Sequence, residues 1–301
     1  MFDRRLAATG IALLVALGCG SSPADPCALQ TPGAQWLAFS AKRADTYDIF
    51  AMRDDGTCPT QVTSGAGDDL FVTWSPAGTL AYMSARSGRM QVYVRDFTTG
   101  AERLLDVGDL TATSPAFSPD GRTVAFEGYA PGVTSVSDVY VVPAAGGTPT
   151  KVTTSQRYSA GPAWSPDGST LYFVSNRSAG YNVWKVPAAG GAETMIPGTT
   201  GVLGRPVATP DGAGIAYTLA ASGAAFTKVV IQALSTGVIR TVSEQADGEP
   251  TFDRSGARMV VTSFRGGNAD LWLLDVSTGA AARQLTTDTG IDGAAAYAPF
   301  P

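Results

Sequence analysis

Short runs in which apolar and polar residues alternate fill the chain from residue 36 onward, and most end in a turn rich in proline, aspartate and glycine. Alternation with a period of two residues is typical of β-strands that bury one face. Two such runs separated by a tight turn predict a β-hairpin. No stretch shows a convincing long amphipathic helical pattern, so the sequence predicts an all-β fold.

One seven-residue stretch recurs along the chain and divides it into units. Its clearest copy is Pro-Ala-Trp-Ser-Pro-Asp-Gly at 162–168, and further copies occupy 72–78, 115–121, 206–212 and 250–256, with a truncated one at 295–299. In the full motif the proline presets φ, the aspartate can bond its own backbone, and the glycine accepts a positive φ. Successive turns lie 43 to 47 residues apart. A repeat of this length that holds several short strands indicates a β-propeller blade.

Four strands fit into each unit, so six units predict a six-bladed β-propeller of four-stranded antiparallel blades. The apolar run at 36–40 matches the second strand of the repeat, yet no first strand precedes it. The segment 294–299 looks like a first strand with no blade after it. We therefore expect this C-terminal strand to complete the first blade and close the ring, which removes the sheet edges of an open array.

The N-terminal segment has the pattern of an export signal. Arg4 and Arg5 precede an apolar run at 6–17 that is too short to span a bilayer. Ala16-Leu17-Gly18-Cys19 resembles a bacterial lipobox, in which Cys19 becomes the lipidated first residue; cleavage by ordinary signal peptidase is the alternative. The residues after Cys19 include no aspartate of the kind that retains lipoproteins at the inner membrane, so the resemblance implies the outer membrane. The expected parts are a signal peptide at 1–18, a lipid-anchored tether at 19–34 and a propeller at 35–301.

The tether contains Cys27, and Cys58 is the other cysteine left after Cys19. An exported chain meets an oxidising compartment, where the two could form a disulfide that pins the tether to the first blade. Two unpaired thiols are the alternative.

The repeated motif carries a resemblance to a known family. The stretch at 162–168, Ser175-Asn176-Arg177 and Asn182-Val183-Trp184 resemble the WD-repeat-like blades of the TolB propeller family, and the resemblance covers residues 36–300. It implies a six-bladed propeller and says little of function, because each motif has a structural role within its blade. TolB itself carries an α/β domain before its propeller, whereas a short tether precedes Trp36 here, so no activity of that domain is expected.

Composition excludes several kinds of chemistry. The chain has no histidine, so Ser-His-Asp and Cys-His hydrolysis and imidazole-based zinc, copper or iron sites are not expected. The net charge of −5 argues against nucleic acid and anionic lipid headgroups as partners. The turn Ser165-Pro166-Asp167-Gly168 is one residue shorter than the Ser-x-Asp-x-Gly box of sialidases. We expect no catalytic site, no cofactor and no metal.

Two sets of repeated residues are ambiguous on spacing alone. The turn aspartates Asp120, Asp167 and Asp211 could be metal ligands, but aspartates at such turns more often cap the backbone. One aromatic residue per repeat could line a ligand site, but its regular recurrence favours packing between blades. These aromatics are Trp74, Phe117, Trp164, Phe252 and Tyr297.

The alternation of antiparallel strands predicts two different faces. Turns after first and third strands fall on one side, the turn face, and are short and built of Pro, Gly and Asp. Loops after second strands and between blades fall on the other side, the loop face; they are longer and more varied, and such loops usually carry function. Near the channel we expect partner-binding residues at Asp68, Asp69, Asp109, Glu249 and Asp292, with Arg157, Tyr158 and Arg205 beside them. Farther out lie Arg43, Arg86, Arg177 and Arg265.

An acidic channel mouth beside a basic sector would attract a positively charged segment or a cation, and added salt would weaken the attraction. Solvated loop charge without a partner is the alternative. The sequence thus predicts a monomeric, non-enzymatic protein-binding platform on the periplasmic side of the outer membrane or on the cell surface, touching the membrane only through its lipid. A carbohydrate-active enzyme or glycan-binding propeller using the central pocket, and a spacer that binds nothing specifically, are the other hypotheses.

Overall fold

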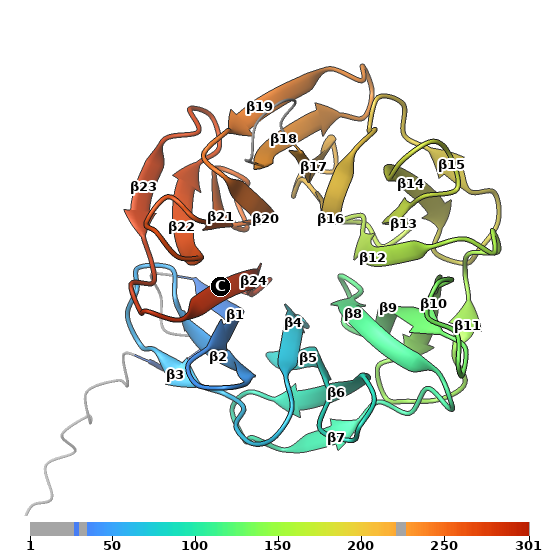
Figure 1. Cartoon of the computed structure of the whole chain (residues 1–301), viewed down its shortest axis with the longest axis horizontal. Helices are drawn as coiled ribbons and strands as arrows, with labels where there is room; N and C mark the ends of the chain where they lie inside the picture. Colours follow the sequence, from blue (N-terminus) through green and yellow to red (C-terminus); the bar gives the residue numbers. More distant parts are fainter. Residues whose placement is uncertain (1–26, 30–34, 221–226, 301) are drawn as a thin grey trace, which may run out of the picture.

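The chain forms a ring of six four-stranded antiparallel sheets around a central channel, as expected (Figure 1). This computed structural model describes residues 27–29, 35–220 and 227–300. The expected signal peptide, Cys19 and most of the tether lie outside these residues. Within the described ranges no helix has the length and apolarity needed to span a membrane.

Each blade runs from an inner strand at the channel to a short outer strand at the rim (Figure 1). Blade 1 consists of β24 (Ile291–Tyr297), β1 (Trp36–Lys42), β2 (Tyr47–Arg53) and β3 (Thr60–Gln61). Blade 2 consists of β4 (Asp69–Trp74), β5 (Thr79–Ser84), β6 (Gln91–Asp96) and β7 (Glu102–Leu104). Blade 3 consists of β8 (Thr111–Phe117), β9 (Thr123–Tyr129), β10 (Asp138–Pro143) and β11 (Thr150–Lys151).

The other three blades repeat this order. Blade 4 consists of β12 (Ser159–Trp164), β13 (Thr170–Ser175), β14 (Asn182–Pro187) and β15 (Thr194–Met195). Blade 5 consists of β16 (Val202–Ala208), β17 (Gly214–Ala220), β18 (Thr227–Ala233) and β19 (Ile239–Ser243). Blade 6 consists of β20 (Asp247–Phe252), β21 (Arg258–Ser263), β22 (Asp270–Asp275) and β23 (Ala281–Gln284).

The two ends of the chain complete one sheet, so the predicted closure is confirmed. Strand β24 is the inner strand of blade 1 and pairs antiparallel with β1, with Leu37 opposite Tyr297 and Ala41 opposite Asp292. Without β24, strand β1 would present its unpaired backbone groups to the channel.

The hydrophobic core is divided among the interfaces between neighbouring blades. Between blades 1 and 2, for example, Trp36 and Ile49 pack with Trp74 and Tyr82, and all four are at least 96% buried. The repeated aromatics lie in these interfaces, as predicted; Trp164 is half-buried and donates from Nε1 to the carbonyl of Ala116 at 3.0 Å. Because each blade shares its core with two neighbours, the ring is expected to unfold cooperatively.

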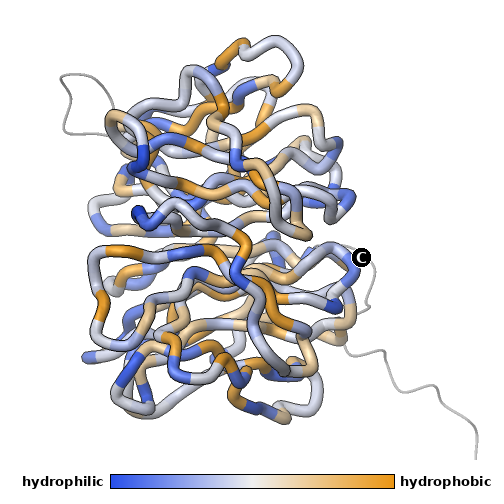
Figure 2. The backbone as a smooth tube through the Cα atoms, turned by 90° about the vertical axis from the view of Figure 1, so that its right-hand side faces the viewer, coloured by the Kyte–Doolittle hydropathy of each residue, from blue (hydrophilic) through white to orange (hydrophobic). Residues whose placement is uncertain are grey.

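The turn aspartates cap the backbone and do not gather around a common point. Asp120 Oδ1 accepts a hydrogen bond from the Ser118 hydroxyl at 2.6 Å and from the Arg122 amide at 3.0 Å. Asp167 and Asp211 repeat this pattern one and two blades on. These hydrogen bonds, led by the one from the turn hydroxyl, hold the pKa of each carboxyl below its usual value. In the edge-on view of Figure 2, hydrophilic residues gather at many of the turns.

The structure contains the disulfide that the sequence left open. Cys27 and Cys58 are bonded, with their Cα atoms 5.6 Å apart. Cys58 lies in the turn after β2, which is the third strand of blade 1 and ends on the turn face. Beside the bridge the carbonyl of Ala28 accepts a hydrogen bond from Arg53 Nη2 at 3.1 Å, and Leu29 packs on the core between blades 1 and 2. The end of the tether is thus fixed to the turn face.

Candidate functional site

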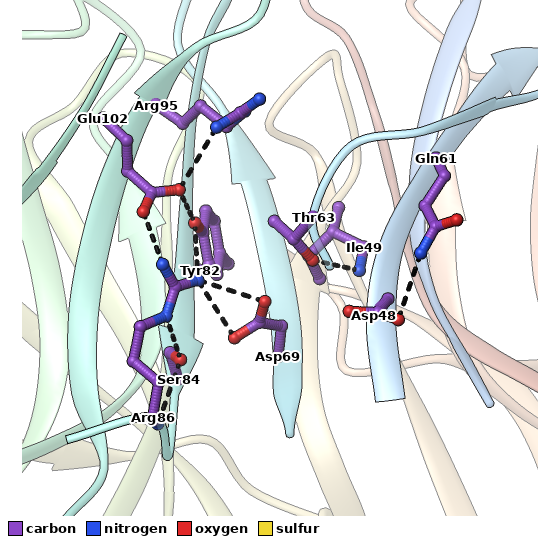
Figure 3. A network of polar contacts seen from close by, with 10 residues as sticks. All are labelled: Asp48, Ile49, Gln61, Thr63, Asp69, Tyr82, Ser84, Arg86, Arg95 and Glu102. Carbon is purple, nitrogen blue, oxygen red and sulfur yellow. Dashed lines mark hydrogen bonds and ion pairs between the residues drawn. The ribbon is translucent and has the colours of Figure 1, made fainter. Parts of the chain in front are cut away.

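The arginines that follow second strands fold back over their own blades. Arg86 stacks on the ring of Tyr93, with Cζ 4.3 Å from the ring centroid, and its Nε donates to the Ser84 hydroxyl at 2.9 Å. Its Nη2 lies 3.1 Å from Asp69 Oδ2 at the start of β4, and Nη1 bonds Glu102 on β7 (Figure 3). One guanidinium therefore links the inner, second, third and outer strands of blade 2.

Three other blades repeat this arrangement with different partners. Arg265 stacks on Trp272 and pairs with Asp247, and Arg43 stacks on Phe50 and pairs with Asp292. In blade 4 a hydroxyl replaces the inner carboxylate, so Arg177 donates to Ser159 at 2.9 Å and pairs with Glu193, which directly precedes the outer strand β15. In these four blades the contacts join the inner strand to the rest of its blade on the loop face.

The expected division into an exposed acidic mouth and a separate basic sector is therefore wrong. Asp69 is 3% exposed and Asp292 is fully buried. Each is neutralised by an arginine of its own blade. A buried carboxylate needs such a partner because burying an unpaired charge is costly. These four arginines and the two aspartates hold together the strands of their own blades, and little of their charge is left to attract a partner.

Other predicted residues lie on the loop face but do not form one cluster. Asp109 and Arg157 are exposed, and Asp68 Oδ1 accepts a hydrogen bond from the amide of Tyr47 in blade 1 at 3.0 Å. Tyr158 packs edge-on against Tyr181, with ring centroids 5.8 Å apart, and burial raises its pKa to about 12.

The mouth of the channel on this face is apolar. A cavity of about 500 Å³, here called the loop-face funnel, has a mainly apolar lining. Phe264 is 60% exposed at its rim, and Leu203 and Ile291 are each more than 40% exposed. Exposed apolar side chains gathered in one place typically mark a binding surface. The other main side chains of the funnel are Tyr47, Leu70, Phe71 and Glu249.

Glu249 is the charged residue among those that line the funnel. Its Oε2 accepts hydrogen bonds from the Thr262 hydroxyl and from the Ala294 amide, both at 2.8 Å. No hydrogen bond within the described chain reaches its Oε1. Glu249 sits on a bulge of β20 with a φ of 51°, a conformation that costs energy for a residue other than glycine. The carboxylate is thus fixed in position with one oxygen free for a ligand.

Arg205, predicted on the loop face, lies inside the channel instead. Its Nη1 donates to the carbonyl of Pro115 in blade 3 at 3.2 Å, although Arg205 belongs to blade 5. It lines the cavity at the turn-face end of the channel and not the loop-face funnel.

The funnel was not predicted from the sequence, because the prediction of the binding face rested on charged residues. Its signal was present: Phe264, Leu203 and Ile291 are large apolar residues in or beside loops of glycine and polar residues. Among the described residues no group of three or more His, Cys, Asp or Glu is arranged to hold a metal ion.

Comparisons with known proteins agree with this geometry. The family model described as TolB beta propeller domain matches residues 80–226. A TolB homolog from Chlorobium luteolum is 47% identical over 57 residues, which is 19% of this chain. Over 88% of the chain, the crystal structure of TolB from Acinetobacter baumannii superposes with a TM-score of 0.77 at 23% identity. Residues 80–226 thus belong to the TolB β-propeller family, and the whole ring shares its fold.

Other solved propellers share the fold of this TolB-like chain. A protein assigned as TolB in Agrobacterium tumefaciens has a TM-score of 0.71 at 19% identity, over 89% of this chain and 94% of its own. A more distant neighbour is an oligogalacturonate lyase in complex with manganese, with a TM-score of 0.60 at 17% identity over 83% of this chain and 73% of its own. This TolB-like propeller spans 66% of the Acinetobacter TolB chain, and its match covers 13% of the Chlorobium protein.

Proposed function

We propose that this TolB-like propeller is a monomeric, non-enzymatic platform that binds another protein in the bacterial cell envelope. The observation that carries the proposal is the loop-face funnel, where Phe264, Leu203 and Ile291 are exposed around one cavity. A rigid ring that presents an apolar, pre-formed hollow can bind an extended segment without paying to order its own loops.

The occupant we propose is an extended protein segment with apolar side chains and one basic group. The apolar side chains would cover Phe264 and Leu203, which otherwise meet water. The basic group, a lysine, an arginine or an amino terminus, would pair with the free oxygen of Glu249 in the lining of the funnel. The proposed occupant thus still has the basic group expected from the sequence, but that group would pair with a single carboxylate and not with an acidic channel mouth.

The experiment is affinity capture from an envelope extract of the bacterium that encodes the chain, with the recovered proteins quantified by mass spectrometry. The doubly substituted Phe264→Ser, Leu203→Ser protein should recover its main partner about tenfold less well or worse, because central apolar contacts carry most of the binding energy. Val238→Ser is the matched control: Val238 is 65% exposed but lies in the turn after β18, on the turn face.

Equal recovery by the double variant and the unchanged protein would refute the proposal, as would an equal loss in the Val238→Ser control. Glu249→Gln tests the basic group separately. Capture that depends on Phe264 but is insensitive to both Glu249→Gln and added salt would overturn the charged contact and leave an apolar partner.

We also propose that Cys19 is lipidated and anchors the propeller at the outer membrane. The proposal rests on the lipobox-like sequence before Cys19. Replacing Cys19 by serine should release the protein into the soluble periplasmic fraction, and the unchanged protein should carry the mass of a lipid on its N-terminal cysteine. Identical fractionation of the two proteins, or no lipid mass, would remove this claim.

A further inference from the structure

A second cavity lies at the opposite end of the channel, on the turn face. It has a volume of about 290 Å³ and shares no lining residue with the loop-face funnel. We call it the turn-face pocket. Its walls are mainly proline and aromatic side chains, and Arg205 is the charged residue among those that line it. The principal wall residues are Trp74, Phe117, Trp164, Pro76, Pro119 and Pro166.

An irregularity of blade 5 brings Arg205 into the channel. The inner strand of every blade contains a bulge; in blade 2, for instance, residues 71 and 72 oppose the single residue Tyr82. In blade 5, three residues, 204–206, oppose Tyr217. The neighbouring inner strand makes room for this wider bulge at Gly161, where an added Cβ would lie only 3.1 Å from the Cα of Arg205.

The guanidinium of Arg205 has few partners for its five donor hydrogens. One hydrogen bond, to the carbonyl of Pro115, is formed within the described chain, and no carboxylate there lies within ion-pair distance. Burial lowers the pKa of Arg205, and the field of Glu249 opposes that shift. Arginine nevertheless stays protonated in proteins, so the channel holds a positive charge that lacks a direct counter-ion.

We propose that the turn-face pocket binds a small organic carboxylate through Arg205. A guanidinium offers two parallel N–H donors whose spacing matches the two oxygens of a carboxylate. A single cation among apolar walls suits a monoanion that carries an aliphatic or aromatic group. A phosphate would bring more negative charge than Arg205 can neutralise.

Two hydroxyls of the same pocket can supplement the guanidinium. Thr73 and Thr251 occupy the position after the bulge in blades 2 and 6, where the other blades have alanine or valine. Each hydroxyl oxygen accepts a backbone amide hydrogen from the next blade, Thr73 from Phe117 at 3.5 Å and Thr251 from Tyr297 at 3.3 Å. Neither donates a hydrogen bond of its own within the described chain, so both can donate to a carboxylate.

The test uses benzoate as the probe and benzamide as its neutral isostere, with binding followed by calorimetry and by NMR of the tryptophan indoles. The full protein should bind benzoate and discriminate against benzamide. Arg205→Gln should weaken benzoate binding about tenfold or more, because a hydrogen-bonded charge is lost. Arg254→Gln is the matched control, since Arg254 is exposed on the turn face outside the pocket.

Equal affinity for benzoate and benzamide, an equal loss in the Arg254→Gln control, or no binding of benzoate would overturn the proposal. If Arg205→Gln fails to fold, the unchanged protein and Thr251→Val decide instead: Thr251→Val should weaken benzoate binding and leave the melting temperature near that of the parent. This site is separate from the loop-face funnel, so either proposal can fail without the other.

Discussion

Arg43 and Asp292 join the two ends of the chain. Nη1 of Arg43, on the loop after β1, donates to Oδ1 of Asp292 on β24 at 2.5 Å, across 249 residues of sequence. Asp292 is fully buried, whereas Asp288, which contacts the same guanidinium at 2.9 Å, has a side chain that is 63% exposed. One arginine thus makes both a buried and an exposed ion pair, so the contributions of the two pairs to stability can be compared at the same residue.

Removing the buried partner should cost much more than removing the exposed one. We expect Asp292→Ala to lower the free energy of unfolding by about 3 kcal/mol, because it leaves Arg43 without its buried counter-charge. Asp288→Ala should cost at most about 1 kcal/mol, as is typical of exposed pairs. Denaturant unfolding of the three proteins measures the difference. Equal costs would show that the pair does not hold the ring closed.

Deleting residues 294–299 should destabilise the whole ring. Without this part of β24, strand β1 loses its pairing at Leu37 and Ala38, and the core between blades 6 and 1 loses Ala295 and Tyr297. Since a domain is stable by only about 5–15 kcal/mol, the loss should remove most of that margin. The melting temperature of the truncated protein measures the effect. A difference of only a few degrees would contradict the role of β24.

Glu127 gives the fold a pH dependence of known sign. Its side chain is 4% exposed on β9 and accepts hydrogen bonds from Tyr129 at 2.5 Å and Thr113 at 3.2 Å. Burial raises the pKa of the carboxyl above 4.5, with the hydrogen bond from Tyr129 acting in the opposite direction. A raised pKa means that the folded state favours the protonated form, so the contribution is fully present at low pH and lost as the pH rises through the folded-state pKa.

We therefore expect Glu127→Gln, which stays neutral, to lose less stability than the parent protein between about pH 4 and pH 7. Glu244→Gln, at an exposed glutamate on the loop face, should follow the parent curve. Melting temperatures across this range provide the measurement. Parallel curves for the parent and Glu127→Gln would contradict the assignment.

Loss of the disulfide should weaken the fold without changing its architecture. Cys27 and Cys58 are 31 residues apart, and closing a loop of this length is worth about 2–4 kcal/mol. We expect the Cys27→Ser, Cys58→Ser protein to keep its strand pairing, seen by circular dichroism, and to unfold at a lower denaturant concentration. An unchanged midpoint would show that the bridge constrains only the tether.

The architecture could be predicted from the sequence because its signals are local. The turn at 162–168 and its copies each contain the residues that a tight turn requires, and their spacing fixes the number of blades. Ring closure followed from one unpaired strand at each end. These features depend on a few neighbouring residues, and the tertiary structure leaves them unchanged.

The charged part of the candidate site could not be predicted in this way. In the sequence Asp69 and Arg86 are assigned to two separate loops. Their pairing depends on Arg86 folding back over Tyr93. Charge-neutralising substitutions at Asp68, Asp69, Asp109, Glu249 and Asp292 together would therefore damage the fold as well as any binding. The position of Arg205 depends on a single extra residue in one bulge, which a repeat pattern does not reveal.

The disulfide also bears on how the propeller would stand on a membrane. If Cys19 is lipidated as proposed, the eight residues from Cys19 to Cys27 can span at most about 29 Å. The disulfide to Cys58 attaches the end of this tether to the turn face. The turn face would then be held toward the bilayer, with the turn-face pocket opening on the membrane side. The loop-face funnel would look away into the surrounding compartment, where a partner can approach it along the axis of the ring.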